Sequence, residues 1–479
     1  MIWESSEEKE ITPRAEVFAI GMGECGSNLV GAYLKKSKEK ALPPRIRGYL
    51  LMNTDRADIQ KVRTLYDIPK AHTLLYGESD TGVGGKFSDG YSYIHQSKDI
   101  ILDQLTQLGY EGVSGFVIFT SLGGGTGCGG TPALVEVLKH RFEVMEQRRI
   151  FIYVIGVLPF KNQSSEAVNT VWAVTKLLRN QLQDIGPDLI VLISNRAMLK
   201  RILSWRSGVI EDFLSKELEI DVGDMGDIEK LVPSTLEEDS QDAMLKQQEQ
   251  TFIDLVNPLA LEVTDYMLSP GVVEQGKRVF PTTDLADYSH KLDPIIVPCL
   301  YTDVGFIPSA GNIPAQFQRI VDHTVNQCSY TEIGKDPRAE SVYYVFSGPS
   351  AITRPEFDMH VKSGLQKYVL PGAAITPCFV QFTDQEKVSN DITAPDKKPA
   401  SLLVLLGLPK IPEFKDILFE ASQLIKLHTG PSPIKREWFR RSKGTTRDAL
   451  EKALADLKEL FGYYMFESPQ EETSSGESP

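Results

Sequence analysis

Short apolar runs alternate with longer segments of helical periodicity over the first 200 residues of the chain. This alternation is typical of a mostly parallel β-sheet that helices cover on both faces. The expected strands are residues 16–20, 47–52, 115–120, 150–158 and 188–194. The pattern therefore predicts an α/β fold with a Rossmann-like N-terminal domain.

Two amphipathic helices are expected between the later strands of this sheet. The first covers residues 131–147, with Thr131 as its cap, Pro132 at its first position and apolar residues on one face. The second covers residues 165–183 with the same spacing of apolar positions. Both helices should pack on the sheet.

The second half of the chain predicts a smaller α/β domain. Acidic residues crowd residues 211–242, which indicates a solvated insertion, and a helical segment at 243–268 is stopped by Pro270 and Gly271. Further strands are expected at 294–301, 341–347, 377–382 and 401–406, with helices at 355–367 and 414–427. The expected organisation is a first α/β domain at 1–242 with its insertion at 205–242, a long central helix at 243–271, a second α/β domain at 272–432, a helical region at 433–466 and a disordered acidic tail at 467–479.

Composition and charge narrow the classes of function. Sixty-five acidic and 51 basic residues give a net charge of −14, which disfavours nucleic acid as a partner. No apolar run approaches the roughly 20 residues that span a bilayer, and the N-terminus lacks the pattern of a signal peptide. The five scattered cysteines indicate reduced thiols, so we expect a soluble cytoplasmic protein.

Three glycine-rich segments follow expected strands and carry the candidate chemistry. The first is Gly21-Met-Gly-Glu-Cys-Gly26, a GxGxxG string that opens a helix, and the second is the run Gly123–Gly129. A third cluster contains Gly82, Gly84 and Gly85. Glycines let backbone amides approach a phosphate, and five glycines and a threonine in seven residues suit a di- or triphosphate. No Gly-Lys-Ser/Thr follows the glycines, so the P-loop pattern is absent from the sequence.

The run Gly123–Gly129 resembles the Gly-Gly-Gly-Thr-Gly-Ser-Gly signature of the tubulin/FtsZ superfamily, with Cys128 in place of serine. Asn53-Thr54-Asp55 is similar to a second phosphate-side loop of FtsZ, and the segments 156–159 and 345–349 are most similar to the archaeal CetZ branch. The resemblance covers residues 16–427, strongly in the first half. It implies a cytoskeletal GTPase that binds GTP or GDP with Mg²⁺ and polymerises head to tail with copies of itself, with a membrane adaptor or another cytoskeletal protein as a further partner.

The resemblance also implies which residues bind the nucleotide. From the two glycine strings and the third cluster these are Gly21, Gly23, Glu24, Cys25, Gly26, Asn28, Gly82, Gly84, Gly85, Gly123, Gly124, Gly125, Thr126, Gly127, Cys128 and Gly129. From the remaining loops they are Asn53, Thr54, Asp55, Pro159, Glu166, Asn195 and Asp254. Pro258 interrupts the expected central helix, and if Asn257-Pro258 starts a new helix, Asp254 loses its expected place.

Asp284 and Asp287 are the catalytic candidates. The segment 282–287 resembles the Asn-x-Asp-x-x-Asp stretch that follows the central helix of FtsZ, with Thr282 in place of asparagine. Two carboxylates three residues apart at a helix start share a face and can orient a water that attacks a γ-phosphate. In that family they act on the nucleotide of the neighbouring subunit. A second register, Asn257 to Glu262, keeps the asparagine and one acid.

Two other functions stay open at this point. A nucleotide-binding relative that does not hydrolyse GTP would serve as a scaffold, and an NAD-dependent oxidoreductase would use only the first glycine string, with Asp55 as its ribose-binding acid. The basic and aromatic residues 435–447 predict a solvated helix face or linker. The seven histidines lie apart from one another, and no protein-held metal site is expected.

Overall fold

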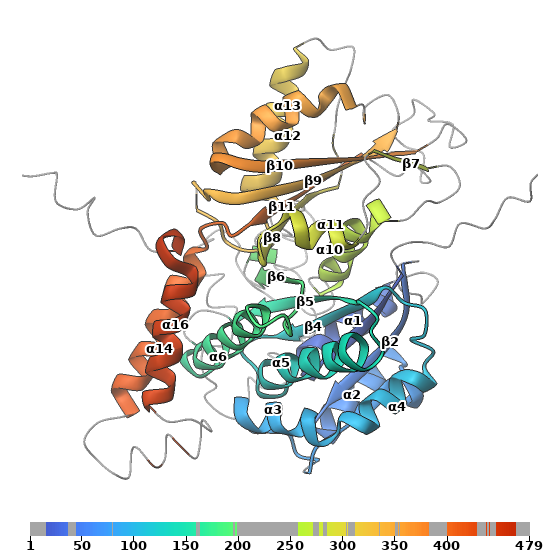
Figure 1. Ribbon diagram of the computed structural model, residues 1–479, viewed down its shortest axis with the longest axis vertical. Coiled ribbons are helices and arrows are strands. Elements are labelled where there is room, and N and C mark those ends of the chain that lie inside the picture. The colour runs from blue at the N-terminus through green and yellow to red at the C-terminus, as the bar shows by residue number, and fades with distance from the viewer. Residues whose placement is uncertain are drawn as a thin grey trace, which may run out of the picture.

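The computed structural model describes most of the chain between residues 16 and 465 (Figure 1). The described residues are 16–36, 45–159, 163–194, 257–271, 277–280, 285–302, 312–349, 355–382, 400–428 and 447–465, apart from residues 79 and 335, together with a few isolated positions between these ranges. The acidic insertion at 205–242, residues 243–256 of the expected central helix and the tail at 467–479 lie outside them.

Within the described residues, eleven strands form one continuous sheet in the order β3-β2-β1-β4-β5-β6-β8-β11-β9-β10-β7. The strands of the first half, all parallel, are β1 (Val17–Met22), β2 (Ile46–Asn53), β3 (Thr73–Leu75), β4 (Gly115–Ser121), β5 (Phe151–Leu158) and β6 (Leu189–Ser194). Those of the second half are β7 (Lys277–Phe280), β8 (Ile295–Tyr301), β9 (Ala339–Pro349), β10 (Val369–Phe382) and β11 (Ser401–Gly407). In the second half β9 and β10 run parallel, whereas β11 and β7 pair antiparallel with their neighbours.

Helices cover both faces of the first half of the sheet. One face packs against α1 (Gly23–Lys36), α2 (Arg56–Tyr66) and α10 (Pro258–Leu268). The other carries α3 (Phe87–Gln96), α4 (Lys98–Gln107), α5 (Gly125–Lys139) and α6 (Ser164–Gln181). Helices α14 (Pro412–His428) and α16 (Arg447–Met465) lie side by side along α6, as Figure 1 shows. The described helices include none that is both long and apolar enough to cross a membrane.

The second half adds three further helices to the sheet. Helices α12 (Ile313–Gln327) and α13 (Asp358–Leu365) pack on β8, β9 and β11, whose inward side chains form a separate apolar cluster with them. The short helix α11 (Leu285–Lys291) is fixed on the opposite face by Tyr288, which is buried against Tyr343 and donates its hydroxyl proton to the carbonyl of Met267 at 2.6 Å.

The two halves of the chain are joined by strand pairing and by a common apolar cluster, which the sequence does not predict for separate domains. Strand β6 pairs in parallel with β8, with Ile190 opposite Ile295 and Val191 opposite Ile296. This pairing joins the strands of the two halves into one sheet. A single apolar cluster extends from Val17 on β1 to Val380 on β10. The mostly parallel α/β architecture is confirmed, and its second part is continuous with the first.

The five N-terminal strands predicted from apolar runs are confirmed, but the predicted start of the helix after β4 is wrong. Helix α5 begins at Gly125 with Gly124 as its N-cap, not at Thr131. Thr131 is buried inside the helix and donates its hydroxyl proton to the hydroxyl of Thr120 on β4 at 3.0 Å. Packing on β4 and α3 therefore outweighs the low helix propensity of the glycine run. The helix is also shorter at its far end, where a π-helical turn (His140–Met145) follows Lys139.

The helix before the turn at Ser269–Gly271 starts at Asn257-Pro258, which is one of the two alternatives that the sequence left open. Helix α10 starts at Pro258, with Asn257 as its N-cap residue, because a proline at the first position of a helix loses no intrahelical hydrogen bond. Asp265 on α10 holds the buried Arg45, before β2, through an ion pair of 2.7 Å. This contact ties α10 to the first half of the sheet.

Candidate functional site

A cavity of about 360 Å³ opens at the carboxyl edge of the parallel strands. We call it the glycine cavity, and its walls come from the ends of β1, β2, β4 and β5 and from the starts of α1, α2, α5 and α6. Its lining residues are Met22, Gly23, Glu24, Cys25, Asn53, Asp58, Ser121, Gly124, Gly125, Thr126, Gly127, Val157, Leu158, Pro159, Gln163 and Glu166. Ligands of open α/β sheets bind at this edge, where helix N-termini converge.

The first wall is the turn from β1 into α1. Gly23 makes the turn with φ of +72°, a left-handed conformation that favours glycine, and its Cα faces the amide of Gly127 in the second glycine segment. Gly26 lies against the carbonyl of Phe119 on β4, where a Cβ atom would come within 2.0 Å of the oxygen. Glycine at position 26 thus permits close helix–strand packing, which places Glu24 and Cys25 at the cavity.

The second wall is the turn from β4 into α5. The amides of Gly123 and Gly124 both donate to the hydroxyl oxygen of Ser121, at 3.2 and 3.3 Å. A Cβ atom at Gly124 would meet nothing closer than 3.9 Å, so this glycine faces open space. With Gly125 and Gly127 it lines the cavity at the positive end of the α5 dipole, which suits an anion.

Cavity-facing acids and amides extend this site at the start of α2. The side-chain Nδ2 of Asn53 donates to the carboxylate of Asp58 at 3.0 Å, and Glu24 forms an ion pair with Lys61 at 2.9 Å. Burial raises the pKa of Asp58, and the charges of Glu24 and Asp55 add to the rise, while the hydrogen bond from Asn53 opposes it. Burial and the charge of Glu24 raise the pKa of the Cys25 thiol to about 12, so this cysteine is a neutral lining group.

The third glycine cluster supports the second wall from behind. Gly82, Gly84 and Gly85 all have positive φ, and Gly125 lies so close that a Cβ on it would come within 2.8 Å of the Cα of Gly85. The amide of Gly82 donates to the carbonyl of Thr54 at 3.1 Å. The hydroxyl groups of Thr54 and Thr126 are 2.7 Å apart, so three loops meet beside the cavity.

The structure brings ten of the nominated binding residues to the cavity surface. They are Gly23, Glu24, Cys25, Asn53, Gly124, Gly125, Thr126, Gly127, Pro159 and Glu166. Eleven others are described but do not line it: Gly21, Gly26, Asn28, Thr54, Asp55, Gly82, Gly84, Gly85, Gly123, Cys128 and Gly129. Asn195, Asp254 and the catalytic candidate Asp284 lie outside the described residues.

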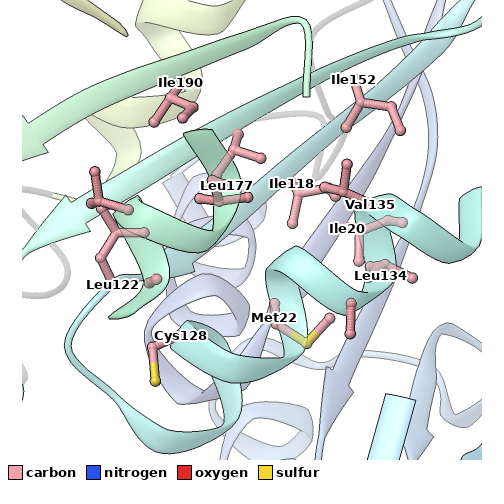
Figure 2. Packing of buried hydrophobic residues seen from close by; sticks show 14 of the residues in the cluster. Ile20, Met22, Ile118, Leu122, Cys128, Leu134, Val135, Ile152, Leu177 and Ile190 are labelled. Carbon is pink, nitrogen blue, oxygen red and sulfur yellow. The ribbon is translucent and has the colours of Figure 1, made fainter. Parts of the chain in front are cut away.

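Several of the residues away from the cavity have identifiable structural tasks. Cys128 is buried in the apolar cluster with Met22 and Leu122, as Figure 2 shows. Gly129 faces the backbone of α3, where a Cβ would lie 2.1 Å from the carbonyl oxygen of Phe87. Asp55 is the N-cap of α2, because its carboxylate accepts from the amides of residues 57 and 58. The ribose contact that an NAD-dependent oxidoreductase would need from Asp55 therefore has no support here.

Sequence analysis missed Met22, Asp58, Ser121, Val157, Leu158 and Gln163. Ser121 could have been found, since it ends a strand directly before the glycine run. Asp58 carried no such signal, because its place depends on the pairing of β2 with β1. Among the described residues no group of three or more histidine, cysteine or acidic side chains is arranged to hold a metal ion.

The remaining catalytic candidate, Asp287, lies near the other edge of the sheet. It is on α11, about one third exposed, and pairs with Lys291 at 3.0 Å. The next residues of α11, Ser289 and His290, line a second cavity of about 590 Å³ together with Arg149 and Asp188, which precede β5 and β6. We call this the amino-edge cavity. Strand β5 separates the two cavities by eight residues, or about 25 Å.

Comparisons with known proteins agree with this arrangement. The family model described as Tubulin/FtsZ family, GTPase domain, matches residues 16–202. A tubulin-like protein CetZ of Pyrococcus horikoshii is 27% identical over 202 residues, which are 39% of this chain and 51% of that protein. CetZ3 of Haloferax volcanii is 28% identical over 150 residues, 30% of this chain and 35% of that protein. The chain thus spans about half the length, or less, of the curated relatives it matches.

Two solved structures share the fold over most of the chain. CetZ2 of Haloferax volcanii, described as a GTPγS-bound protofilament, superimposes with a TM-score of 0.60 at 16% identity and covers 87% of this chain and 100% of its own. CetZ1 of the same organism, described as a GDP-bound monomer, superimposes with a TM-score of 0.55 at 16% identity. The match covers 85% of this chain and 99% of CetZ1. Residues 16–202 thus match the GTPase domain of the tubulin/FtsZ family, and the chain as a whole shares the fold of the CetZ structures.

Proposed function

We propose that this protein is a cytoplasmic GTPase that assembles head to tail and hydrolyses GTP at the junctions between its subunits. The observation that carries the proposal is the separation of the two candidate groups. The glycine cavity lies at the carboxyl end of β5, whereas Asp287 lies two residues before Ser289 in the wall of the amino-edge cavity, and the length of β5, about 25 Å, separates the two cavities. A carboxylate beside the amino-edge cavity acts on a bound phosphate only when a second copy brings it there.

The glycine cavity offers what a nucleoside triphosphate needs. Amides at the starts of α1 and α5 point to one space, so phosphate oxygens would accept from Glu24, Cys25 and Gly124–Gly127. Glu166 and Pro159 line the part formed by β5 and α6, where the ribose would lie. Guanine recognition by Asn195 and Asp254 remains part of the proposal, and neither residue belongs to the described chain.

Mg²⁺ fits the donor set of this cavity. It binds through one or two carboxylates together with substrate phosphates, and Asp58 and Glu24 face the space in which the phosphates would lie. When bound, the ion would neutralise charge on the transferring phosphoryl group. Asp58 and Glu24 would hold its water shell, with Asn53 orienting Asp58 through their 3.0 Å hydrogen bond.

Asp287, with Asp284 beside it in the sequence, would orient the attacking water at the junction. Tyr288 holds α11 against the end of α10, which leaves the preceding carboxylate partly exposed on the surface of the subunit. The CetZ2 structure supports self-association, because that protein shares this fold and forms a GTPγS-bound protofilament.

Replacement of Asp287 tests the proposal. D287A should bind GTP and assemble as the wild type does, but lose GTP turnover by about 100-fold or more, since a positioned general base contributes 10²–10⁴. The lost ion pair with Lys291 is exposed and contributes about 0.5 kcal/mol or less. K291A is the matched control, because it removes the same ion pair and keeps the carboxylate. Turnover is measured by phosphate release against protein concentration, and unchanged turnover in D287A would overturn the assignment.

A mixing experiment tests whether the site is shared. G124D puts a carboxylate into the glycine cavity without a steric clash, because the space around Gly124 is open. Neither D287A nor G124D should hydrolyse GTP alone, whereas an equimolar mixture should recover roughly a quarter of the wild-type turnover, from junctions that pair an intact cavity with an intact acid. No recovery in a mixture that co-sediments as one polymer would argue for a site within one subunit.

A further inference from the structure

Asn169 on α6 joins two of the glycine loops from behind the glycine cavity. Its side-chain Nδ2 donates to the carbonyl of Gly85 and to the carbonyl of Gly123, both at 2.9 Å. The residue is 2% exposed and does not line the cavity. A carboxamide nitrogen carries two hydrogens, and here each hydrogen is used on a different loop.

The three glycines of the loop that Asn169 joins to Gly123 contribute no side-chain packing. Gly82, Gly84 and Gly85 have φ of +79°, +56° and +71°, and Cβ atoms at Gly84 and Gly85 would touch nothing within 4 Å. Backbone without side chains gains little from packing, and glycine loses more conformational freedom on ordering than other residues. Hydrogen bonds to the loop backbone therefore have a large share in fixing its position.

The position of that loop decides where Gly125 lies. Val83 and Gly85 abut the Cα of Gly125 so closely that a Cβ on Gly125 would come within 2.7 and 2.8 Å of them. Gly125 begins α5 and lines the cavity with Gly124. Asn169 thus binds two residues that flank the start of α5: Gly123, which precedes it in the chain, and Gly85, which packs against Gly125.

Helix α6 supplies the clamp and a cavity residue from one face. Glu166 lies three residues before Asn169, one turn earlier on the helix, and lines the cavity. The Oδ1 atom of Asn169 accepts no hydrogen bond from the described residues, so the two donated bonds set the orientation of its carboxamide. The reverse orientation would place Oδ1 against two carbonyl oxygens, which is unfavourable.

We propose that Asn169 is a positioning residue that clamps the Gly82–Gly85 loop to the Gly123–Gly127 loop and so favours nucleoside triphosphate over diphosphate. The inference rests on the proposed nucleotide-binding function. Each phosphoryl group adds oxygens and charge that need preorganised amide donors. A loosened amide wall therefore costs a triphosphate more of its binding than a diphosphate.

Asn180 provides a matched control on the same helix. It is 1% exposed, its Nδ2 donates to Glu136 at 2.6 Å, and its Oδ1 also accepts no hydrogen bond from the described residues. Glu136 belongs to the outer part of α5 and does not line the cavity. N169A and N180A therefore each remove a buried amide from α6, and only N169A releases the glycine loops.

The test is fluorescence titration of dilute protein with mant-GTPγS and mant-GDP. N169A should lose about tenfold in affinity for mant-GTPγS and less than about threefold for mant-GDP, while N180A keeps the wild-type ratio. Melting temperatures of both variants show how much of any loss is general destabilisation. If wild type binds neither nucleotide, the proposed function fails. If wild type binds and N169A keeps its ratio, only the clamp is refuted.

A pH profile separates the clamp from a packing role. N169D replaces the donor by a carboxylate facing two carbonyl oxygens, and burial there favours the protonated acid, which can donate one hydrogen bond. The affinity of N169D for mant-GTPγS, relative to wild type at the same pH, should recover in part between pH 7.5 and pH 5.5. The relative affinity of N169A should stay constant. Parallel profiles of the two variants would refute the clamp.

Discussion

Replacement of Gly26 by alanine should weaken nucleotide binding in the glycine cavity, although Gly26 itself does not line that cavity. A Cβ at this position would lie 2.0 Å from the carbonyl oxygen of Phe119 and 2.9 Å from its carbon, both backbone atoms of β4. To reach an ordinary contact of about 3.4 Å, α1 must retreat by roughly 1.4 Å. Because Glu24 and Cys25 in the first turn of α1 line the cavity, their amides retreat with it.

The expected cost has two parts. Overpacking costs about 1–3 kcal/mol in stability, and the higher helix propensity of alanine offsets up to about 1 kcal/mol of it. A displacement of more than about 1 Å at a binding or catalytic centre can cost about 100-fold in function. G26A should therefore show a modest fall in melting temperature and a loss of GTP affinity well beyond that fall.

The control for G26A is G31A on the same helix. Its Cβ would lie 2.2 Å from the buried ring of Tyr66 on α2, so G31A overpacks the same helix against α2 and leaves the contact of α1 with β4 unchanged. Thermal unfolding followed by circular dichroism and titration with mant-GTP measure both variants. If G26A binds GTP as G31A does, the close packing of α1 on β4 does not position the cavity, and the argument is refuted.

Two further predictions concern contacts around the cavity. Burial raises the pKa of Glu136, but hydrogen bonds from Tyr91, Lys176 and Asn180 outweigh it and lower the pKa below 4.5, so this group stabilises the fold above its unfolded pKa and the stability is lost as pH falls below about 4.5. E136Q should be about 1–3 kcal/mol less stable at pH 7, and its free energy of unfolding in urea should change less than that of the wild type between about pH 5 and pH 3; a wild-type slope there would contradict this. T126V leaves the hydroxyl of Thr54 without its 2.7 Å partner and should weaken binding of mant-GTPγS by about tenfold, while undiminished affinity would show that this loop contact is dispensable.

Local pattern was enough to place nine of the eleven described strands and the three glycine segments, and it missed the short strands β3 and β7. The apolar runs at 115–120 and 188–194 became β4 and β6 with little change, because a strand buried on both faces needs only a continuous apolar run. The glycine run was found for a similar reason, since such a density of glycine is rare outside a loop that approaches a ligand. Its internal structure was not found, and α5 starts seven residues earlier than the predicted cap Thr131 implies.

Within the candidate site, the sequence identified the loops better than the individual contacts. Gly124 and Gly129 look alike in the sequence, yet one faces the cavity and the other faces the backbone of α3. Asp55 matched the motif and caps α2, whereas Asp58 matched nothing and lines the cavity. The side of a helix turn that a residue faces depends on neighbours that are far away in the chain.

The sequence by itself determined that this chain forms a mostly parallel α/β sheet with glycine-rich loops after its strands. Hydrophobic periodicity and glycine content can be recognised within a few consecutive residues. Only the tertiary structure decided that β6 pairs with β8 to unite the two halves, and that helix α11, which carries Asp287, contributes to a cavity at the other end of β5 from the glycine cavity. Strand pairing and helix packing join residues more than 100 positions apart, and local pattern carries no information on which partners will meet. The separation of the glycine cavity from helix α11 is therefore a property of the fold alone.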